Sequence, residues 1–475
     1  MRTLTLLISL SIFSINLLLS QRIDFSRTYG GQGYQDARSI VSCNDGGFVY
    51  TGLNKGSVDS LGDMYLTKIN AAGAVLWEHF YGLPKEDGGN FLMKTQDNGF
   101  IISGHTAYNY GSSCNGYIIK TNSEGEEIWK RFVGTAFDDV CNGAVQNTKG
   151  DYYFTGRVED PETNNFDVML CKIAQDGTYE FMKTFGGQKD DIGYKIIETI
   201  DGNLLIVGYS ENEETKKESL YLIKCDLEGN LIWELRTMDT NVNTRAYAGL
   251  LSENGDLIVA GGIAKYKNKQ SIQSAFISII DNNGVLKSFK LLMEEEGKSY
   301  GYDLCKNNKN EFAITGSITP NNESNNQPFI LVFNKNLEIL DHKIIPHLNE
   351  TRTVSIINIS DRDFLLAGKS KKEGDSDILI NRVNLYNSTS TNASQQLPYT
   401  LFPNPMLEYT YLRIENTPSD KVLNLYDSQG HLVSNYDFKG NELFLYRENL
   451  IKGMYYFKII ERNGKLVTSG SILIQ

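Results

Sequence analysis

Short apolar runs separated by glycine-containing turns recur along most of the chain. In the first clear example, Arg38–Cys43, Phe48–Gly52, Met64–Ile69 and Val75–Tyr81 predict four β-strands. Asp45–Gly47 separates the first two runs with residues that tolerate a positive φ, as a tight hairpin requires. The middle runs are almost continuously apolar, which predicts strands in sheets that are covered on both faces.

This four-strand unit returns at a nearly constant period. The glycine that closes the second run of each unit lies at Gly52, Gly104, Gly156, Gly208, Gly261, Gly316 and Gly368. The steps between these glycines are 52, 52, 52, 53, 55 and 52 residues. A repeat of this length predicts a solenoid, a propeller or another array of one supersecondary unit.

A small residue fifteen positions before each closing glycine favours a closed ring. These positions hold Ala37, Gly89, Cys141, Gly193, Ala246, Gly301 and Thr353. The innermost strands of a propeller converge on its axis, where bulky side chains would clash, whereas a straight solenoid has no such crowding. The sequence therefore predicts an all-β fold, a seven-bladed β-propeller with four strands in each blade.

The two ends of the repeat region predict how the ring closes. The seventh unit ends after its third run, Asp377–Ile380, and lacks a fourth. Ile23–Gly31 is similar to the fourth run of the third unit, Tyr179–Gly187. We expect the N-terminal strand to complete the last blade and so to remove an unpaired sheet edge.

The fourth runs hold an aromatic residue at one place: Trp77, Trp129 and Trp233, with Phe181 in the third unit. With Gly52, Gly62-Asp63, Gly73 and Tyr81-Gly82 around Trp77, the units resemble the bacterial SBBP-type β-propeller repeat. The resemblance covers roughly residues 22 to 384 and is loose in units five to seven. It implies a fold and no activity.

The chain start predicts export. Residues 1–20 read as a signal peptide, because a short basic start precedes an apolar run that ends at Ser20. The alternative is a membrane anchor, but Leu4–Leu19 is shorter than the roughly 20 apolar residues of a spanning helix. No later segment predicts a transmembrane helix. We expect residues 21–385 to form the propeller, 386–399 a polar linker and 400–475 a separate module.

The C-terminal module predicts a small, Ig-like β-sandwich. Its apolar runs are Tyr411–Ile414, Val422–Tyr426, Leu443–Tyr446, Met454–Ile460 and Ser471–Ile474. Phe402-Pro403-Asn404-Pro405, the turn at Gly430 and the Gly453-Met454-Tyr455 segment make it similar to the type A sorting domain of the type IX secretion system of the Bacteroidota.

That resemblance implies passage through the periplasm and across the outer membrane, with the secretion machinery as partner. It implies a secreted or cell-surface protein. The chain end, Ser471–Gln475, departs from the family by lacking lysines. The alternative is an ordinary accessory domain.

Charge and cysteine content narrow the class of protein. The net charge of −12 argues against nucleic acid and anionic membranes as partners. The six cysteines have no tight framework, and the strand assignment places Cys141, Cys171 and Cys225 too far apart for disulfides. We expect free thiols.

Candidate chemistry is sparse. The five histidines are scattered and no catalytic motif is present, so we predict no catalytic residue, metal or cofactor, and the sequence does not favour an enzyme. Asp87, Asp139 and Asp191 lie seventeen residues before closing glycines, where a carboxylate ring would hold a ligand or a cation. The alternative is that each caps backbone amides of its own loop.

The loops between the second and third strands differ in every unit, so specificity is expected there. Tyr108, Asn109, Tyr110 and Tyr266 suit stacking on sugar rings beside amide donors. The leading hypothesis is a binding propeller for an extracellular glycan or protein. An exported carbohydrate-active enzyme using channel carboxylates and a structural scaffold of an envelope assembly remain as alternatives.

Overall fold

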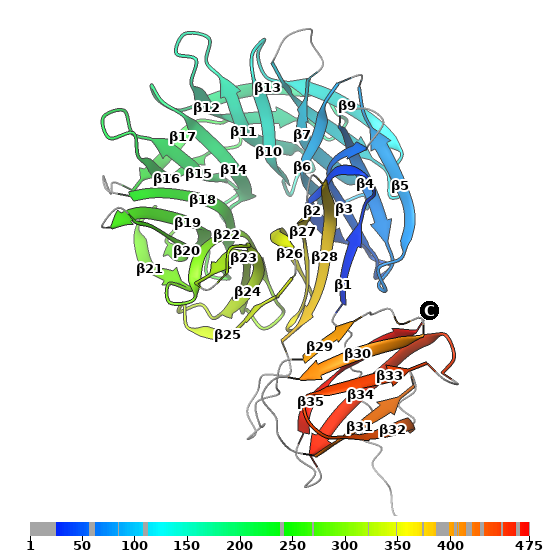
Figure 1. Ribbon diagram of the computed structural model, residues 1–475. Helices are drawn as coiled ribbons and strands as arrows, with labels where there is room; N and C mark the ends of the chain where they lie inside the picture. The colour runs from blue at the N-terminus through cyan, green and yellow to red at the C-terminus, as the bar shows by residue number, and fades with distance from the viewer. Residues whose placement is uncertain are drawn as a thin grey trace, which may run out of the picture. The chain divides into compact units, whose positions relative to one another are not determined.

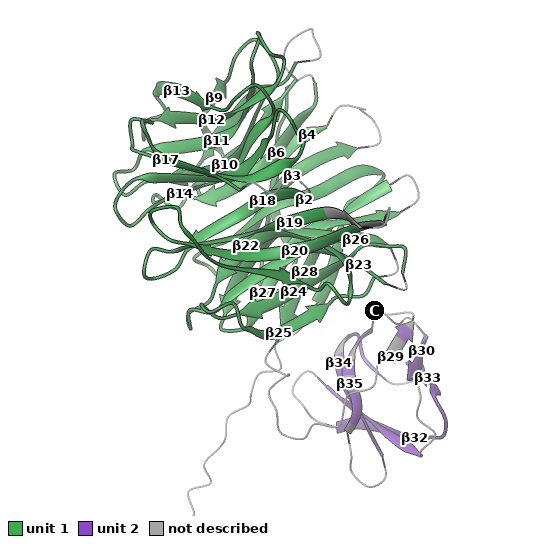
Figure 2. Cartoon of the chain, turned by 90° about the vertical axis from the view of Figure 1, so that its left-hand side faces the viewer, with its two compact units in different colours: residues 1–387 green, residues 388–475 purple. Residues whose placement is uncertain are grey.

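The structure is a computed structural model of the whole chain. It describes residues 25–474 except 57–61, 84, 108–112, 238–241, 268–269, 322, 348, 373–374, 386–398, 403–405, 407, 415–419, 428–431, 448–449 and 462–465. The predicted signal peptide lies outside these residues. The chain divides into two compact units, Met1–Asn387 and Ser388–Gln475 (Figure 2).

The described residues form strands and no helix. This part of the chain therefore contains no helix that is long and apolar enough to cross a membrane. The all-β prediction is confirmed. In the first unit most strands group in fours, in chain order, as sheets that resemble propeller blades (Figure 1). We number these groups sheet 1 to sheet 7.

Sheets 1 to 4 follow the predicted units. Sheet 1 is β2 (Gly33–Ser42), β3 (Phe48–Gly56), β4 (Asp63–Ile69) and β5 (Val75–Tyr81); sheet 2 is β6 (Asp87–Lys94), β7 (Phe100–Thr106), β8 (Asn115–Thr121) and β9 (Glu127–Val133); sheet 3 is β10 (Asp139–Gln146), β11 (Tyr152–Glu159), β12 (Phe166–Ile173) and β13 (Tyr179–Phe185); sheet 4 is β14 (Asp191–Glu198), β15 (Leu204–Glu211), β16 (Glu218–Cys225) and β17 (Leu231–Arg236).

Sheets 5 to 7 continue the series. Sheet 5 is β18 (Val242–Leu251), β19 (Leu257–Lys267), β20 (Gln270–Ile280) and β21 (Leu286–Leu292); sheet 6 is β22 (Gly297–Lys306), β23 (Phe312–Pro320), β24 (Gln327–Phe333) and β25 (Ile339–Ile344); sheet 7 is β26 (Glu350–Ser360), β27 (Asp363–Lys372) and β28 (Asp375–Asn384) with β1 (Phe25–Tyr29).

The N-terminal strand occupies the fourth place of sheet 7. β1 pairs antiparallel with β28, from Phe25 opposite Arg382 to Tyr29 opposite Ile378. A single parallel bridge, Tyr34 to Ser376, also joins β2 to β28, so sheets 7 and 1 share hydrogen bonds. The predicted pairing of the N-terminal strand with the third strand of the last unit is confirmed.

The core of the first unit lies between neighbouring sheets. One cluster joins Met64 and Leu66 of sheet 1 to Ile102 and Ile119 of sheet 2, and another joins sheet 1 to sheet 7. Each first strand contacts the next first strand, and β26 contacts β2. The middle strands are buried on both faces, which explains their continuous apolar pattern.

The second unit holds two sheets around one apolar core. The three-stranded sheet is β29 (Tyr399–Phe402), β30 (Tyr409–Ile414) and β33 (Glu442–Tyr446); the other is β32 (Leu432–Phe438), β31 (Lys421–Tyr426), β34 (Gly453–Glu461) and β35 (Leu466–Ile474). Leu412 from the first sheet and Leu423, Phe457 and Ile472 from the second are buried together. The sequence pattern missed β29 and β32.

Candidate functional site

Each closing glycine marks a close approach of two strands. A Cβ at Gly52 would lie 2.0 Å from the carbonyl oxygen of Asp36, and the other six closing glycines face a carbonyl in the same way. The pairing slips by one residue at this point: Ala37 is opposite Gly52, but Ser39 is opposite Thr51. Arg38 is therefore the extra residue of a β-bulge.

The same bulge occurs in all seven sheets of the first unit. The extra residues are Arg38, Asn90, Asn142, Tyr194, Tyr247, Tyr302 and Val354. We call them the bulge residues. Their side chains differ in kind, although their backbone positions are equivalent. Polar side chains come from sheets 1 to 3 and tyrosines from sheets 4 to 6.

Neighbouring bulge residues touch one another. Arg38 Nη1 donates to Asn90 Oδ1 at 2.7 Å, and Asn90 Nδ2 lies 3.4 Å from Asn142 Oδ1. Tyr194 and Tyr247 have ring centroids 5.0 Å apart. Tyr247 and Tyr302 follow at 5.4 Å. Residues about fifty positions apart in the chain therefore line one common interior, which is polar on one side and aromatic on the other.

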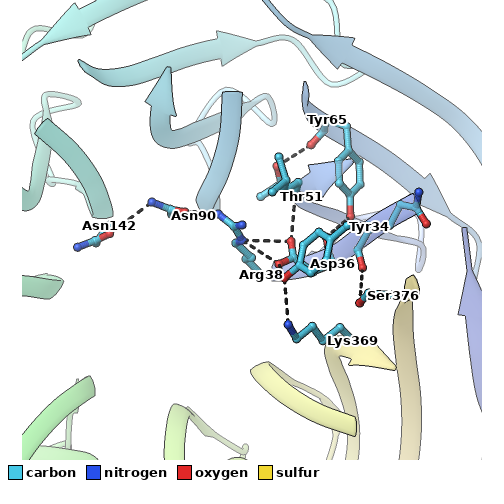
Figure 3. Close-up of polar contacts among 11 residues, drawn as sticks. Tyr34, Asp36, Arg38, Thr51, Tyr65, Asn90, Asn142, Lys369 and Ser376 are labelled. Carbon is cyan, nitrogen blue, oxygen red and sulfur yellow. Dashed lines mark hydrogen bonds and ion pairs between the residues drawn. The ribbon is translucent and has the colours of Figure 1, made fainter. Parts of the chain in front are cut away.

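A chain of hydrogen bonds links sheet 7 to this interior (Figure 3). Lys369 Nζ donates to the Tyr34 hydroxyl at 3.0 Å, and that hydroxyl donates to Asp36 Oδ2, also at 3.0 Å. Arg38 Nε donates to Asp36 Oδ1 at 3.1 Å. Burial and the Asp36 carboxylate raise the pKa of Tyr34 to about 12, so its hydroxyl stays protonated.

A pocket of about 380 Å³ lies at the Lys369 end of this chain. We call it the basic pocket. Its lining comes from sheets 1, 6 and 7: Tyr34, Tyr302, Ser317, Asn326, Glu350, Thr351, Arg352, Lys369, Lys371, Lys372, Asp375 and Ser376. Most of these residues lie where first strands begin and second strands end, the end that carries the loops between second and third strands in which the sequence predicts specificity.

A second pocket, of about 250 Å³, lies at the same ends of sheets 2 to 4. Asn90, Asn142 and Tyr194 line it together with His105 and Arg157. Burial lowers the pKa of His105 to about 4, so this imidazole is neutral at physiological pH. The Arg157 guanidinium lies over the Phe166 ring at 4.1 Å.

A larger hollow of about 550 Å³ lies at the opposite ends of sheets 2 and 3. Lys94 is the one charged residue in its lining, and the bulge residues do not contribute to it. The two pockets near the bulge residues carry more of the polar and aromatic groups that recognise ligands, so the candidate site is placed there.

Most of the loop residues predicted to bind a ligand lie outside the residues that the structure describes. Tyr108, Asn109 and Tyr110 lie outside the described residues. Tyr266 was expected in a loop, but it belongs to β19 and is paired with Ser271 of β20. The hairpin of sheet 5 extends its strands further than the turn-like composition of this segment indicated.

The three repeated aspartates are buried and hold backbone amides. The amide of Leu83 donates to Asp87, that of Thr135 to Asp139, and that of Gly187 to Asp191 at 2.8 Å. Burial raises the pKa of all three carboxyls to about 6. This geometry fits the loop-capping alternative, and we leave these aspartates out of the candidate site.

No group of three or more His, Cys, Asp or Glu suited to a metal ion occurs in the part of the chain that the structure describes. All six cysteines are free thiols, as the sequence analysis expected. Sequence reasoning missed the bulge residues. Their signal was the position directly after the small residues, which varies from unit to unit while its neighbours repeat.

The C-terminal motif lies partly within the described residues. Phe402 ends β29 and Gly453 begins β34 with φ of +154°, whereas Pro403, Asn404, Pro405 and Gly430 lie outside. Residues 400–475 match the family model of the secretion system C-terminal sorting domain. The sorting domain indicates export by the type IX secretion system to the cell surface or into the medium, and implies interaction with the secretion machinery.

No curated protein matches the chain. Among solved structures it is similar to PorZ, a surface component of the type IX secretion system of Porphyromonas gingivalis, with 10% identity and a TM-score of 0.43 over 94% of this chain and 60% of that chain. The chain thus spans 60% of the length of PorZ.

Two further solved structures cover about three quarters of this chain. The Pan2 WD40 domain of Neurospora crassa has 9% identity and a TM-score of 0.45 over 73% of this chain and 89% of that one. Sqt1 of Chaetomium thermophilum has 8% identity and a TM-score of 0.44 over 76% and 100%. These scores assign no function to the chain.

Proposed function

We propose that the mature protein is a secreted or cell-surface binding protein whose ligand, a glycan or a protein, docks over the two pockets beside the bulge residues. The binding region is a seven-bladed β-propeller that β1 closes, and the sorting domain is a β-sandwich. The pairing of β1 with β28 and the contact of β26 with β2 support the closed ring. The common core of the two C-terminal sheets supports the sandwich.

The observation that carries this proposal is the contrast between repeated and unrepeated residues. The closing glycines recur in all seven sheets because two strands approach closely there, and the capping aspartates recur in sheets 2 to 4, where each holds an amide of its own loop. The bulge residues occupy equivalent positions but change from arginine through asparagine to tyrosine. A purely structural position would be expected to keep one kind of side chain, whereas a binding surface needs different groups at different places.

We also propose that the repeats are of the SBBP type, which assigns a fold and no activity. The alternative of a carbohydrate-active enzyme gains no support, because Asp87 and Asp139 are buried and engaged by amides of their own loops.

A glycan and surface-protein array probed with the mature chain tests the proposal, with an activity screen alongside. We expect Tyr302→Leu to weaken the binding of any hit by about tenfold, through loss of one aromatic contact. Tyr179→Leu is the matched control, because Tyr179 is an exposed tyrosine on the outer strand β13.

Circular dichroism must show that both variants fold. Asn142→Ala tests the second pocket in the same way. If neither Tyr302→Leu nor Asn142→Ala weakens binding, the ligand binds elsewhere and the proposal is rejected.

A further inference from the structure

Two positive charges face each other in the basic pocket. Arg352 on β26 is directly opposite Lys369 on β27 in the strand register, so both side chains lie on one face of sheet 7. Like charges directly opposite in an antiparallel pair destabilise the sheet. Burial and the nearby Arg352 guanidinium lower the pKa of Lys369. A fold that keeps such a pair carries a cost that a bound anion would remove.

The lysines around this pair are neutralised, whereas the pair is not. Lys371 lies 3.3 Å from Glu350, and Lys372 lies 3.2 Å from Asp377. Among the described residues, no carboxylate forms an ion pair with Arg352 or Lys369, and the Asp36 and Glu350 carboxylates only partly offset the effects that lower the pKa of Lys369. The nearest acid of the network, Asp36, is already engaged by Arg38, by the Tyr34 hydroxyl and by the amide of Leu53.

Tyr34 holds the lysine in place for a ligand. The Lys369 ammonium donates to the Tyr34 hydroxyl and also lies 4.9 Å from the centre of that ring. An ammonium has three donors, so two remain for a ligand beside the five of the Arg352 guanidinium. Hydrogen bonds from such charged donors to a carboxylate or sulfate are about twice as strong as neutral ones.

We propose that the basic pocket binds an acidic sugar, with the carboxylate or sulfate group of the sugar between Arg352 and Lys369. This inference rests on the proposed function and names its ligand class. The pocket volume of about 380 Å³ suits one or two sugar rings. Tyr34 and Tyr302 supply aromatic surface, and Ser317 and Asn326 supply groups that bond to sugar hydroxyls.

The rest of the chain argues against a general polyanion site. The net charge is −12, so an extended polyanion such as nucleic acid would meet repulsion beyond the pocket. A single anionic group on a small, otherwise neutral ring meets attraction only where Arg352 and Lys369 lie. The pocket therefore selects by local charge.

Calorimetric titration of the mature chain tests the inference. The probes are a trigalacturonate, a sulfated galactose disaccharide, a neutral galactose trisaccharide and a glutamate-rich peptide. We expect the trigalacturonate or the sulfated disaccharide to bind, and the acidic probe that binds identifies the anion. The neutral trisaccharide should bind at least about tenfold more weakly, because it lacks the charge-assisted bonds.

Two variants and one control locate the binding. Arg352→Gln and Lys369→Gln should each weaken the acidic sugar about tenfold or more, whereas Lys371→Gln should change it less than about threefold because Glu350 already pairs with Lys371. Arg352→Gln should also raise the melting temperature of the unliganded protein, since it removes the repulsion. A residue retained for stability alone would lower it.

The outcomes separate this inference from the proposed function. Binding of neither acidic sugar, binding of the peptide alone, or acidic-sugar binding that both glutamine variants leave unchanged would overturn the acidic-sugar assignment. If a neutral glycan or a protein then binds and Tyr302→Leu weakens it, the proposed function stands without the inference. If Tyr302→Leu and Asn142→Ala leave every detected ligand unaffected, the proposed function fails as well.

Discussion

The Tyr29 hydroxyl donates a 2.7 Å hydrogen bond to the carbonyl oxygen of Gly73, which joins β1 to the turn between β4 and β5. Tyr81 makes the same bond to Gly125, from the fourth strand of sheet 1 to the equivalent turn of sheet 2. The N-terminal strand thus makes toward sheet 1 the same contact that the fourth strand of sheet 1 makes toward sheet 2.

Replacing Tyr29 tests whether its contact with sheet 1 stabilises the fold as much as the contact of Tyr81 with sheet 2 does. Tyr29→Phe removes one hydrogen bond and should lower the free energy of unfolding by about 1 kcal/mol, measured by urea denaturation. Tyr81→Phe is the matched variant and should lose a similar amount. A loss with Tyr81→Phe but none with Tyr29→Phe would mean that β1 does not hold the ring in solution.

The turn glycines pack against the aromatic residues of the preceding sheet. Gly177 has φ of +88°, and a Cβ there would lie 2.9 Å from the Trp129 ring. Gly177→Ala should cost about 2 to 4 kcal/mol, through left-handed backbone strain and overpacking against Trp129. Gly202→Ala is the control, because its φ is +76° and no atom lies within 4 Å of a Cβ there.

Thermal or urea denaturation measures both glycine variants. Gly202→Ala should lower the free energy of unfolding by about 1 to 2 kcal/mol, because only the left-handed backbone strain applies there. Equal losses for the two variants would show that the Trp129 contact adds nothing.

The buried aspartates predict a fall of stability with rising pH. Burial raises the pKa of Asp87, Asp139 and Asp191 to about 6 in the folded protein, so the folded state holds these protons more tightly than the unfolded chain. Their contribution to stability is therefore full below the unfolded pKa, near 4, and is lost as pH rises to about 6. Urea denaturation across this range measures the fall.

The triple Asp→Asn variant at these positions should flatten that part of the stability profile. Asp176→Asn is the control, because backbone and side-chain hydrogen bonds with Thr178 lower the pKa of that exposed carboxyl. The fall between pH 4 and pH 6 should survive in the control, and its survival in the triple variant would contradict the assignment.

The free thiols predict a protein indifferent to reductant. In denaturant, the mature chain should titrate six thiols, and in the folded state Cys141, Cys171 and Cys225 should resist labelling because they are buried. Burial also raises the pKa of each of these thiols, so little reactive thiolate forms. Reductant should leave the melting temperature unchanged, and a thiol count below six would reveal a disulfide.

Local chemistry explains which elements were predictable. Hairpin turns such as Asp45–Gly47 and apolar runs such as Leu204–Val207 carry their own signals, so the strands of sheets 1 to 4 match the prediction closely. The hydrophobic pattern did not predict β32 (Leu432–Phe438), because all but its last residue are exposed or half-buried. Such a strand shows no clear alternation of apolar and polar residues. It also missed β29, which directly follows a polar segment.

The sequence by itself determined the repeat, the strand runs within each unit and the sorting domain, because each depends on residues near one another in the chain. Only the tertiary structure decided which side chains share a site. β-Bulges bring Arg38 and the bulge residues of sheets 2 to 6 next to one another, and Tyr34 meets Lys369 across 335 positions of sequence. No local pattern encodes such a meeting, because it depends on the register between strands and on how the sheets come together.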